Sequence, residues 1–128
     1  MTKLFGNLGG KQGQRSTARL LLGVPGKLAM AHGTVPCLID DISASGAKIR
    51  CDAPLSGGAS AELRFEERRG FCAIAWARGG RAGLRFDQRL TLEDIEYFRW
   101  IAANPQQWAQ ASQSAAALEW SSGIDRRG

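Results

Sequence analysis

The sequence has few of the residues on which catalytic and metal-binding sites depend. Among its 128 residues there is one histidine, His32, and no CxxC or HxxxH spacing of the kind that binds zinc. His32 has no recognisable nucleophile partner, and neither a catalytic carboxylate pair nor a phosphate-binding glycine loop can be identified. We therefore expect no enzyme, no metal site and no bound cofactor.

Long apolar runs are also missing. No segment approaches the roughly 20 apolar residues of a membrane span, and no charged segment precedes an apolar stretch of about 7–15 residues, as in a secretory signal. The three cysteines, Cys37, Cys51 and Cys72, are odd in number and lie in apolar or strand-like runs, which is typical of reduced core residues. These features predict a cytoplasmic protein without a membrane span.

The composition fits a single globular domain, with 44% hydrophobic and 23% charged residues. Seventeen basic residues against 12 acidic ones give a net charge of +5, and 13 of the basic residues are arginine. The planar guanidinium suits phosphate oxygens and the O6/N7 edge of guanine, so the balance favours an anionic partner. An ordinary soluble basic surface would have the same composition.

Alternation of apolar and polar residues predicts about six short strands with turns every 8–12 residues, as in a small antiparallel barrel or sandwich. The second strand, for example, places Val35, Cys37 and Ile39 on one face. The expected strands are 20–22, continuing at 27–30 after a turn at Pro25-Gly26, then 34–39, 47–51, 59–66, 71–77 and 82–86. Turns are expected at 41–46, 53–58, 67–70 and 78–81.

Helical spacing replaces this alternation after residue 90. Thr91 and Asp94 form a capping-box pattern, which predicts a helix that begins near Leu92. Asn104-Pro105 should end or bend this helix, and a second helix can restart there and run to Leu118. The aromatic residues of these helices are expected to cap the barrel end or to meet a partner: Tyr97, Trp100 and Trp108.

Together these patterns divide the chain into four parts. Residues 1–14 are rich in glycine and should be a mobile arm. Residues 15–90 should form the barrel, residues 91–118 a helical extension, and residues 119–128 a frayed tail.

The segment Asp41-Ile-Ser-Ala-Ser-Gly46 between two expected strands has the composition of a binding turn. Asp41 and Ser43 offer side-chain oxygens two residues apart, and Gly46 can adopt a positive φ and let another molecule approach the backbone. An Asx-type turn closed by a left-handed glycine needs the same residues. The segment alone fits both interpretations.

Arg15 and Arg19 form an RxxxR motif before the first expected strand, and Asp41, Ser43 and Gly46 form a DxSxxG motif after the second. The PilZ domain family has RxxxR and (D/N)xSxxG motifs at these places, and the chain resembles this family over about residues 15–90. The RxxxR spacing recurs elsewhere in this chain, whereas chance gives only about 0.05 matches to DxSxxG.

Two further segments are similar to the family's fifth and sixth strands. They are Ile74-Ala75-Trp76 and Ala82-Gly83-Leu84-Arg85-Phe86.

The resemblance implies a mainly β fold, a small six-stranded antiparallel β-barrel of the PilZ-like, split-barrel type with a C-terminal helical extension. It also implies a receptor for the bacterial second messenger cyclic di-GMP, which has two guanines and two phosphates. Arg15 and Arg19 would donate hydrogen bonds to phosphate or guanine, or stack on the bases. Asp41 would accept from guanine N–H groups, Ser43 would make one hydrogen bond, and Gly46 would leave room for a base.

Three more residues are weaker candidates for the lining of that site. They are Lys48 and Arg50, which fit an ordinary solvated strand face equally well, and Trp76, which fits a core aromatic equally well. Gln14, just before the RxxxR motif, leaves open whether one ligand or an intercalated pair binds.

In the family, the arm that carries RxxxR wraps over the ligand, so binding should order this arm and create a surface for a downstream protein in motility, exopolysaccharide or adhesion control. One alternative is a PilZ-like interaction module that does not bind nucleotide. A barrel that binds RNA or single-stranded DNA is disfavoured, because the strand aromatics mostly occupy apparent core positions.

Overall fold

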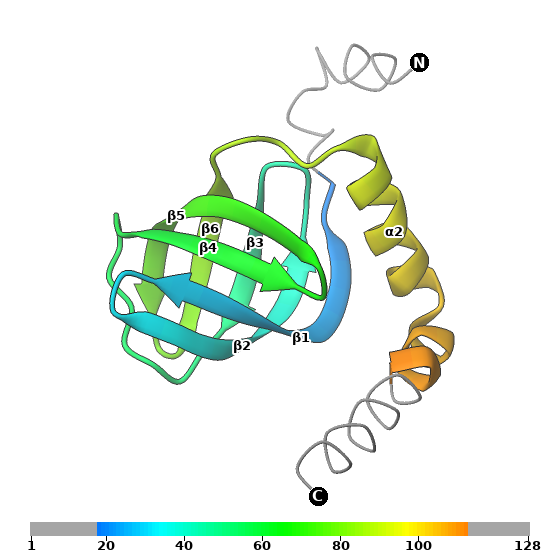
Figure 1. Cartoon of the computed structure of the whole chain (residues 1–128), viewed down its shortest axis with the longest axis horizontal. Helices are drawn as coiled ribbons and strands as arrows, with labels where there is room; N and C mark the ends of the chain where they lie inside the picture. Colours follow the sequence, from blue (N-terminus) through cyan, green and yellow to red (C-terminus); the bar gives the residue numbers. More distant parts are fainter. Residues whose placement is uncertain (1–17, 113–128) are drawn as a thin grey trace, which may run out of the picture.

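The computed structural model describes residues 18–112, so Arg15, the expected arm and the expected tail lie outside the described residues. Within that range six antiparallel strands close into a barrel, in the order β1-β2-β3-β6-β5-β4, and helix α2 lies beside one end (Figure 1). The predicted six-stranded barrel with a helical extension is confirmed. The elements are β1 (Leu20–Met30), β2 (Gly33–Ile42), β3 (Gly46–Arg50), β4 (Ser60–Phe65), β5 (Arg68–Arg78), β6 (Arg81–Phe86) and α2 (Leu92–Ala103).

The barrel interior holds the inward half of each alternating strand. Its best buried side chains are Leu28, Ile39, Ile49 and Ile74. The three cysteines are free and buried, as expected for reduced core residues. Burial, with a smaller contribution from Cys51 and Cys72, raises the pKa of the Cys37 thiol to about 12. Such a thiol is a weak nucleophile at neutral pH.

Strand β1 is continuous, so the expected turn at Pro25-Gly26 is wrong. The irregularity lies earlier, where the pairing with β2 shifts between Leu21 and Val24 and Gly23 adopts a φ of 71°. This is a β-bulge, which bends a strand without ending it. At Pro25 the strand has no pairing on its β4 side, and proline is tolerated at such an edge.

The charged turn expected at 67–70 is shorter than predicted. It consists of Glu66 and Glu67, and Arg68 already begins β5. Glu66 occupies the left-handed region with a φ of 57°, which allows a two-residue hairpin to close between β4 and β5.

The seam between β1 and β4 closes the barrel through only three residue pairs. They are Lys27 with Arg64, Leu28 with Leu63, and Ala29 with Glu62. By contrast, β1 and β2 are paired along most of their length. The seam is therefore the shortest ladder of the barrel.

Helix α2 begins as the capping box predicts, because Thr91 Oγ1 accepts a hydrogen bond of 3.1 Å from the Asp94 amide. It ends at Asn104, and a second helix follows over residues 105–112. This confirms the predicted restart at Pro105, while its expected continuation to Leu118 lies outside the described residues.

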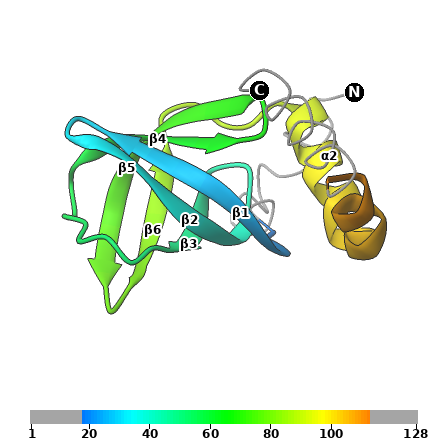
Figure 2. The ribbon, with the colours of Figure 1, turned by 60° about the horizontal axis from the view of Figure 1, so that its bottom comes forward.

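Both views place α2 beside the barrel end at which β1 begins (Figures 1 and 2), and α2 contacts β1 there. Over the part of the chain that the structure describes, no helix is long and apolar enough to cross a membrane.

A cluster of aromatic and charged side chains attaches the helices to the β4–β5 hairpin. The rings of Tyr97 and Trp108 pack on Phe65, with centroids 6.4 and 5.9 Å away, as expected for residues that cap the barrel end. Both also donate hydrogen bonds to the Glu66 carboxylate, Tyr97 Oη at 2.7 Å and Trp108 Nε1 at 3.0 Å. Arg68 adds an ion pair of 2.7 Å to Asp94 of α2.

Candidate functional site

A bulge in β2 determines where Asp41 points. The pairing with β3 shifts between Ile39, which faces Ile49, and Asp41, which faces Lys48, so Asp40 is an extra residue. Since side chains alternate with a period of two, one extra residue reverses the faces that follow. Asp41 therefore lies on the outer side of the barrel. Strict alternation after the buried Ile39 would have placed Asp41 in the core.

The expected turn at 41–46 is shortened by the same geometry. Asp41 and Ile42 are the last residues of β2, and Gly46 is the first residue of β3. Only Ser43, Ala44 and Ser45 connect the two strands.

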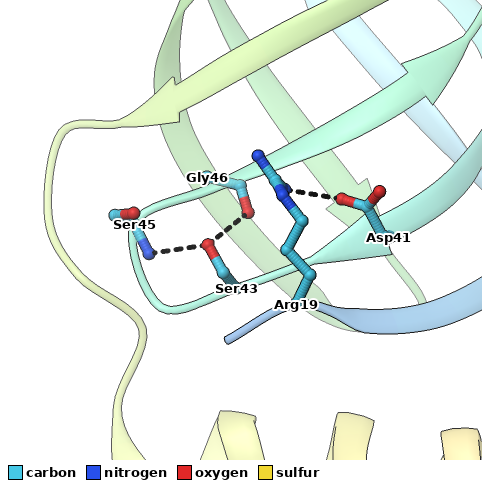
Figure 3. A network of polar contacts seen from close by, with 5 residues as sticks. All are labelled: Arg19, Asp41, Ser43, Ser45 and Gly46. Atoms are coloured by element: carbon cyan, nitrogen blue, oxygen red, sulfur yellow. Dashed lines mark hydrogen bonds and ion pairs between the residues drawn. The ribbon is translucent and has the colours of Figure 1, made fainter. Parts of the chain in front are cut away.

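Arg19 covers the Asp41 carboxylate from the residue just before β1 (Figure 3). Its Nη1 donates to Asp41 Oδ1 at 2.7 Å, and the side chain of Asp41 is 8% exposed while that of Arg19 is 52% exposed. One N–H group of the guanidinium is thus held in place, and within residues 18–112 Asp41 is its only hydrogen-bond partner. Two of the predicted site residues, from segments 22 residues apart, are brought together here.

Ser43 holds the connection in its shape. Its amide donates to the Gly46 carbonyl oxygen at 2.8 Å, and its buried Oγ donates to the same oxygen at 3.4 Å and accepts from the Ser45 amide at 3.3 Å (Figure 3). The Ser43 hydroxyl therefore already makes two hydrogen bonds within the turn.

Gly46 does not have the positive φ that the sequence suggested. Its lack of a side chain is required by strand β6 instead, because a Cβ at this position would overlap the carbonyl oxygen of Leu84. Gly46 thus allows two strands to approach closely.

The turn is also tied to the segment that leads to α2. The Phe86 amide donates to Ser45 O at 2.8 Å, and the Leu90 amide donates to Ala44 O at 2.9 Å. A displacement of the turn would therefore change the hydrogen bonds of the residues that precede α2.

A cross-strand row continues from Asp41 over the outer face. Lys48 on β3 lies opposite both Asp41 and Gly83, and Gly83 on β6 lies opposite Trp76 on β5. Trp76 is 41% exposed, which excludes the interpretation of this residue as a core aromatic. Its indole lies against Gly83, since a Cβ there would overlap the indole nitrogen. The row thus presents a carboxylate, an ammonium and a partly exposed aromatic ring.

Arg50 and Arg85 flank this row in different ways. Arg50, one of the weaker site candidates, forms an ion pair with Asp40, with Nη2 2.8 Å from Oδ1. Its charge is therefore already paired next to the row. Arg85 was not among the predicted site residues, yet it is exposed and lies directly opposite Gly46. Its outward direction follows from the alternation of β6, but its position beside Gly46 depends on the pairing of β3 with β6.

The strand aromatics are less buried than the sequence suggested. Phe65 and Phe86 are in the core, whereas Phe71 is 66% exposed and Trp76 is also partly exposed. Across residues 18–112 no group of three or more His, Cys, Asp or Glu side chains is arranged to hold a metal ion.

The arrangement suits an organic anion with hydrogen-bonding edges. A half-exposed arginine is paired with a carboxylate acceptor at one end of the row, and an aromatic surface lies at the other end.

The comparisons with known proteins agree with this fold. The family model described as PilZ domain matches residues 13–103, and no curated protein matches the chain. The crystal structure of the Borreliella burgdorferi PlzA protein in complex with c-di-GMP is similar, with 20% identity and a TM-score of 0.52. That match covers 69% of this chain and 40% of PlzA, so the chain spans less than half of the PlzA length.

A second similar structure is the PilZ domain of CeSA from a cellulose synthesizing bacterium. It is 22% identical, with a TM-score of 0.46, over 66% of this chain and 92% of that one. At such identities, likeness between structures concerns the fold alone, whereas the family model covers most of the present sequence. The chain belongs to the PilZ domain family.

Proposed function

We propose that this protein is a receptor for cyclic di-GMP. The observation that carries the proposal is the Arg19–Asp41 pair, which holds a half-exposed guanidinium over a carboxylate on the outer face of the barrel. Guanine presents an O6/N7 acceptor edge and an N–H donor edge, and these are complementary to arginine and aspartate respectively. The c-di-GMP complex of the PlzA protein, which has a similar fold, supports the same ligand class.

Each site residue has a distinct role in this proposal. Arg19, with Arg15 from the part outside the described residues, binds phosphate or guanine oxygens. Asp41 accepts from guanine, and Lys48 and Trp76 contribute charge and a stacking surface. Ser43 and Gly46 act through the shape of the turn and the close approach of β6.

Ligand binding is relayed by ordering of the N-terminal segment up to Arg19, which includes Arg15. The Phe86 and Leu90 amides donate hydrogen bonds to the 43–45 turn, and α2 packs on β1, so the site has contacts with the segment that leads to the helical extension and with the extension itself. A downstream protein, in motility or exopolysaccharide control for example, would read the combined surface. Amide exchange tests this relay: residues 15–19 should gain protection with ligand, and equal protection in both states would overturn it.

Calorimetric titration tests the receptor function itself. Cyclic di-GMP should bind in a 1:1 or 2:1 ratio, whereas GMP and cyclic AMP should bind far more weakly because neither presents two guanines and two phosphates. Absence of heat and of NMR shift changes with cyclic di-GMP near a millimolar would refute the receptor function. The chain would then be an interaction module that does not bind nucleotide.

A further inference from the structure

Three arginines cross the outer face of the barrel beside the candidate site. Arg81 on β6 lies directly opposite Arg50 on β3 and directly opposite Arg78 on β5, and all three side chains are exposed. We call these three residues the arginine row. It runs parallel to the row of Lys48, Gly83 and Trp76, displaced by two residues along each strand. Two residues correspond to about 7 Å, and the side chains point to the same face.

The arginine row is electrostatically unfavourable by itself. Like charges directly opposite each other on neighbouring strands repel. Arg50 has a counter-ion in Asp40, but among residues 18–112 no carboxylate forms an ion pair with Arg78 or Arg81. An anion bound between these two arginines would relieve that repulsion.

Open space for such an anion lies next to Arg81. This residue lines two adjoining hollows, one of about 540 Å³ shared with Arg50 and one of about 280 Å³ shared with Arg78. The Gly79-Gly80 turn borders both hollows and adds no side chain to either. Asp52 lines both hollows as well and is the one acidic residue of their lining, while Arg50 is already paired with Asp40.

We propose that Arg78 and Arg81 form a second anion subsite, which binds a phosphate of the ligand at the end of the site opposite Arg19. The inference rests on the proposed function. From Asp41 to Gly83 there are two strand steps of about 4.8 Å each, and the arginine row lies about 7 Å further along the strands. A ligand with two phosphates can reach both cationic groups, whereas a mononucleotide reaches only one. The subsite thus selects cyclic dinucleotides over mononucleotides.

The test compares two double variants that lose the same charge. R78A/R81A removes the subsite, and K27A/R69A removes two cations from another cross-strand row, in which Lys27 and Arg69 both lie opposite Arg64. R78A/R81A should bind cyclic di-GMP about tenfold more weakly, because charge-assisted hydrogen bonds to the ligand are lost. Its affinity for GMP, followed by NMR to millimolar concentrations, should stay at the parent level. Thermal melting without ligand should be no lower than in the parent.

Each other outcome has a separate meaning. An equal loss in K27A/R69A would show that only the overall charge matters, and parental affinity in R78A/R81A would show that the arginine row takes no part in binding. Either result overturns the subsite and leaves the receptor function intact. If the parent itself does not bind cyclic di-GMP, the receptor function fails and the subsite fails with it.

Discussion

The indole of Trp76 lies on the backbone of Gly83, so closely that a β-carbon at position 83 would overlap the indole nitrogen. The two residues face each other across β5 and β6, and the tryptophan nevertheless stays 41% exposed. Gly83 therefore provides a flat support that holds the ring against the barrel.

Gly83→Ala should lower the affinity for cyclic di-GMP about tenfold while the free energy of unfolding changes by less than about 1 kcal/mol. The added methyl group meets a side chain that can swing away, so the ring loses its position and the barrel stays intact. Titration and urea unfolding measure the two effects. Gly70→Ala is the matched control, since a Cβ there makes only ordinary contacts with Phe86. Additive losses in a G83A/W76A double variant would contradict an effect through Trp76.

Gly46→Ala should destabilise the fold by about 2 kcal/mol or more. Its Cβ meets the backbone of Leu84, which cannot rotate away, so β3 and β6 must separate. Urea unfolding gives the change in free energy, and titration of the folded fraction gives the affinity. Parental stability together with lost binding would mean that Gly46 contacts the ligand directly.

Arg19→Ala should weaken binding of cyclic di-GMP about ten- to hundredfold, through loss of charge-assisted hydrogen bonds worth about 1.5–3 kcal/mol. Melting should change little, because Arg19 is half exposed and its removal opens Asp41 to water. Ala61→Asp should do the opposite, since it places an unpaired carboxylate in the core and costs a few kcal/mol. Thermal melts and titrations of both variants provide the comparison. An unfolded R19A protein would make Arg19 a structural residue.

Glu66→Gln should lower the pKa of Tyr97. Burial raises this pKa most, and the hydrogen bond to Glu66 and its charge raise it further. Tyr97 is the only tyrosine of the sequence, so an alkaline absorbance titration reports it alone. Glu67→Gln, at the neighbouring exposed residue, is the control.

The same shift sets a pH dependence of stability. A phenol whose pKa is raised by folding stabilises the native state fully below its unfolded pKa of about 10, and this contribution is lost as the pH rises through the folded value. The free energy of unfolding should therefore fall less steeply above pH 10 in E66Q than in the parent. Identical pH profiles for the two proteins would show that Glu66 does not influence the phenol.

Local patterns were sufficient to predict the number and approximate positions of the strands and the start of the first helix. Alternation identified Ala47, Ile49 and Cys51 as core residues, and all three are buried. The capping pattern at Thr91 located the start of α2. These features are determined by residues close together in the sequence, so the periodicity of apolar residues and the capping pattern can predict them.

The bulges escaped this reasoning. An extra residue such as Asp40 leaves no mark in the composition of a strand, yet it decides that Asp41 faces the outside. The exposure of Trp76 was equally hidden, because a similar shift in β5 lies between Ile74 and Trp76.

Pairing between strands that are distant in sequence could not be predicted either. Strand β3 pairs with β6, and this places Arg85 opposite Gly46 and Arg81 opposite Arg50. This pairing brings Arg81 and Arg85 of β6 next to the candidate site, although the alternating sequence of β6 gives no sign of it.

The three-pair seam between β1 and β4 has a consequence for self-association. Outside these pairs, no strand within residues 18–112 pairs with these two edges, and an unpaired edge can pair with another copy of the sheet and begin aggregation. The seam pairs themselves contain Lys27, Glu62 and Arg64, and Pro25 lies on the part of β1 that is not paired with β4, two residues before Lys27. Charge and proline both oppose pairing between sheets, so solubility at high concentration depends on the residues that close the barrel.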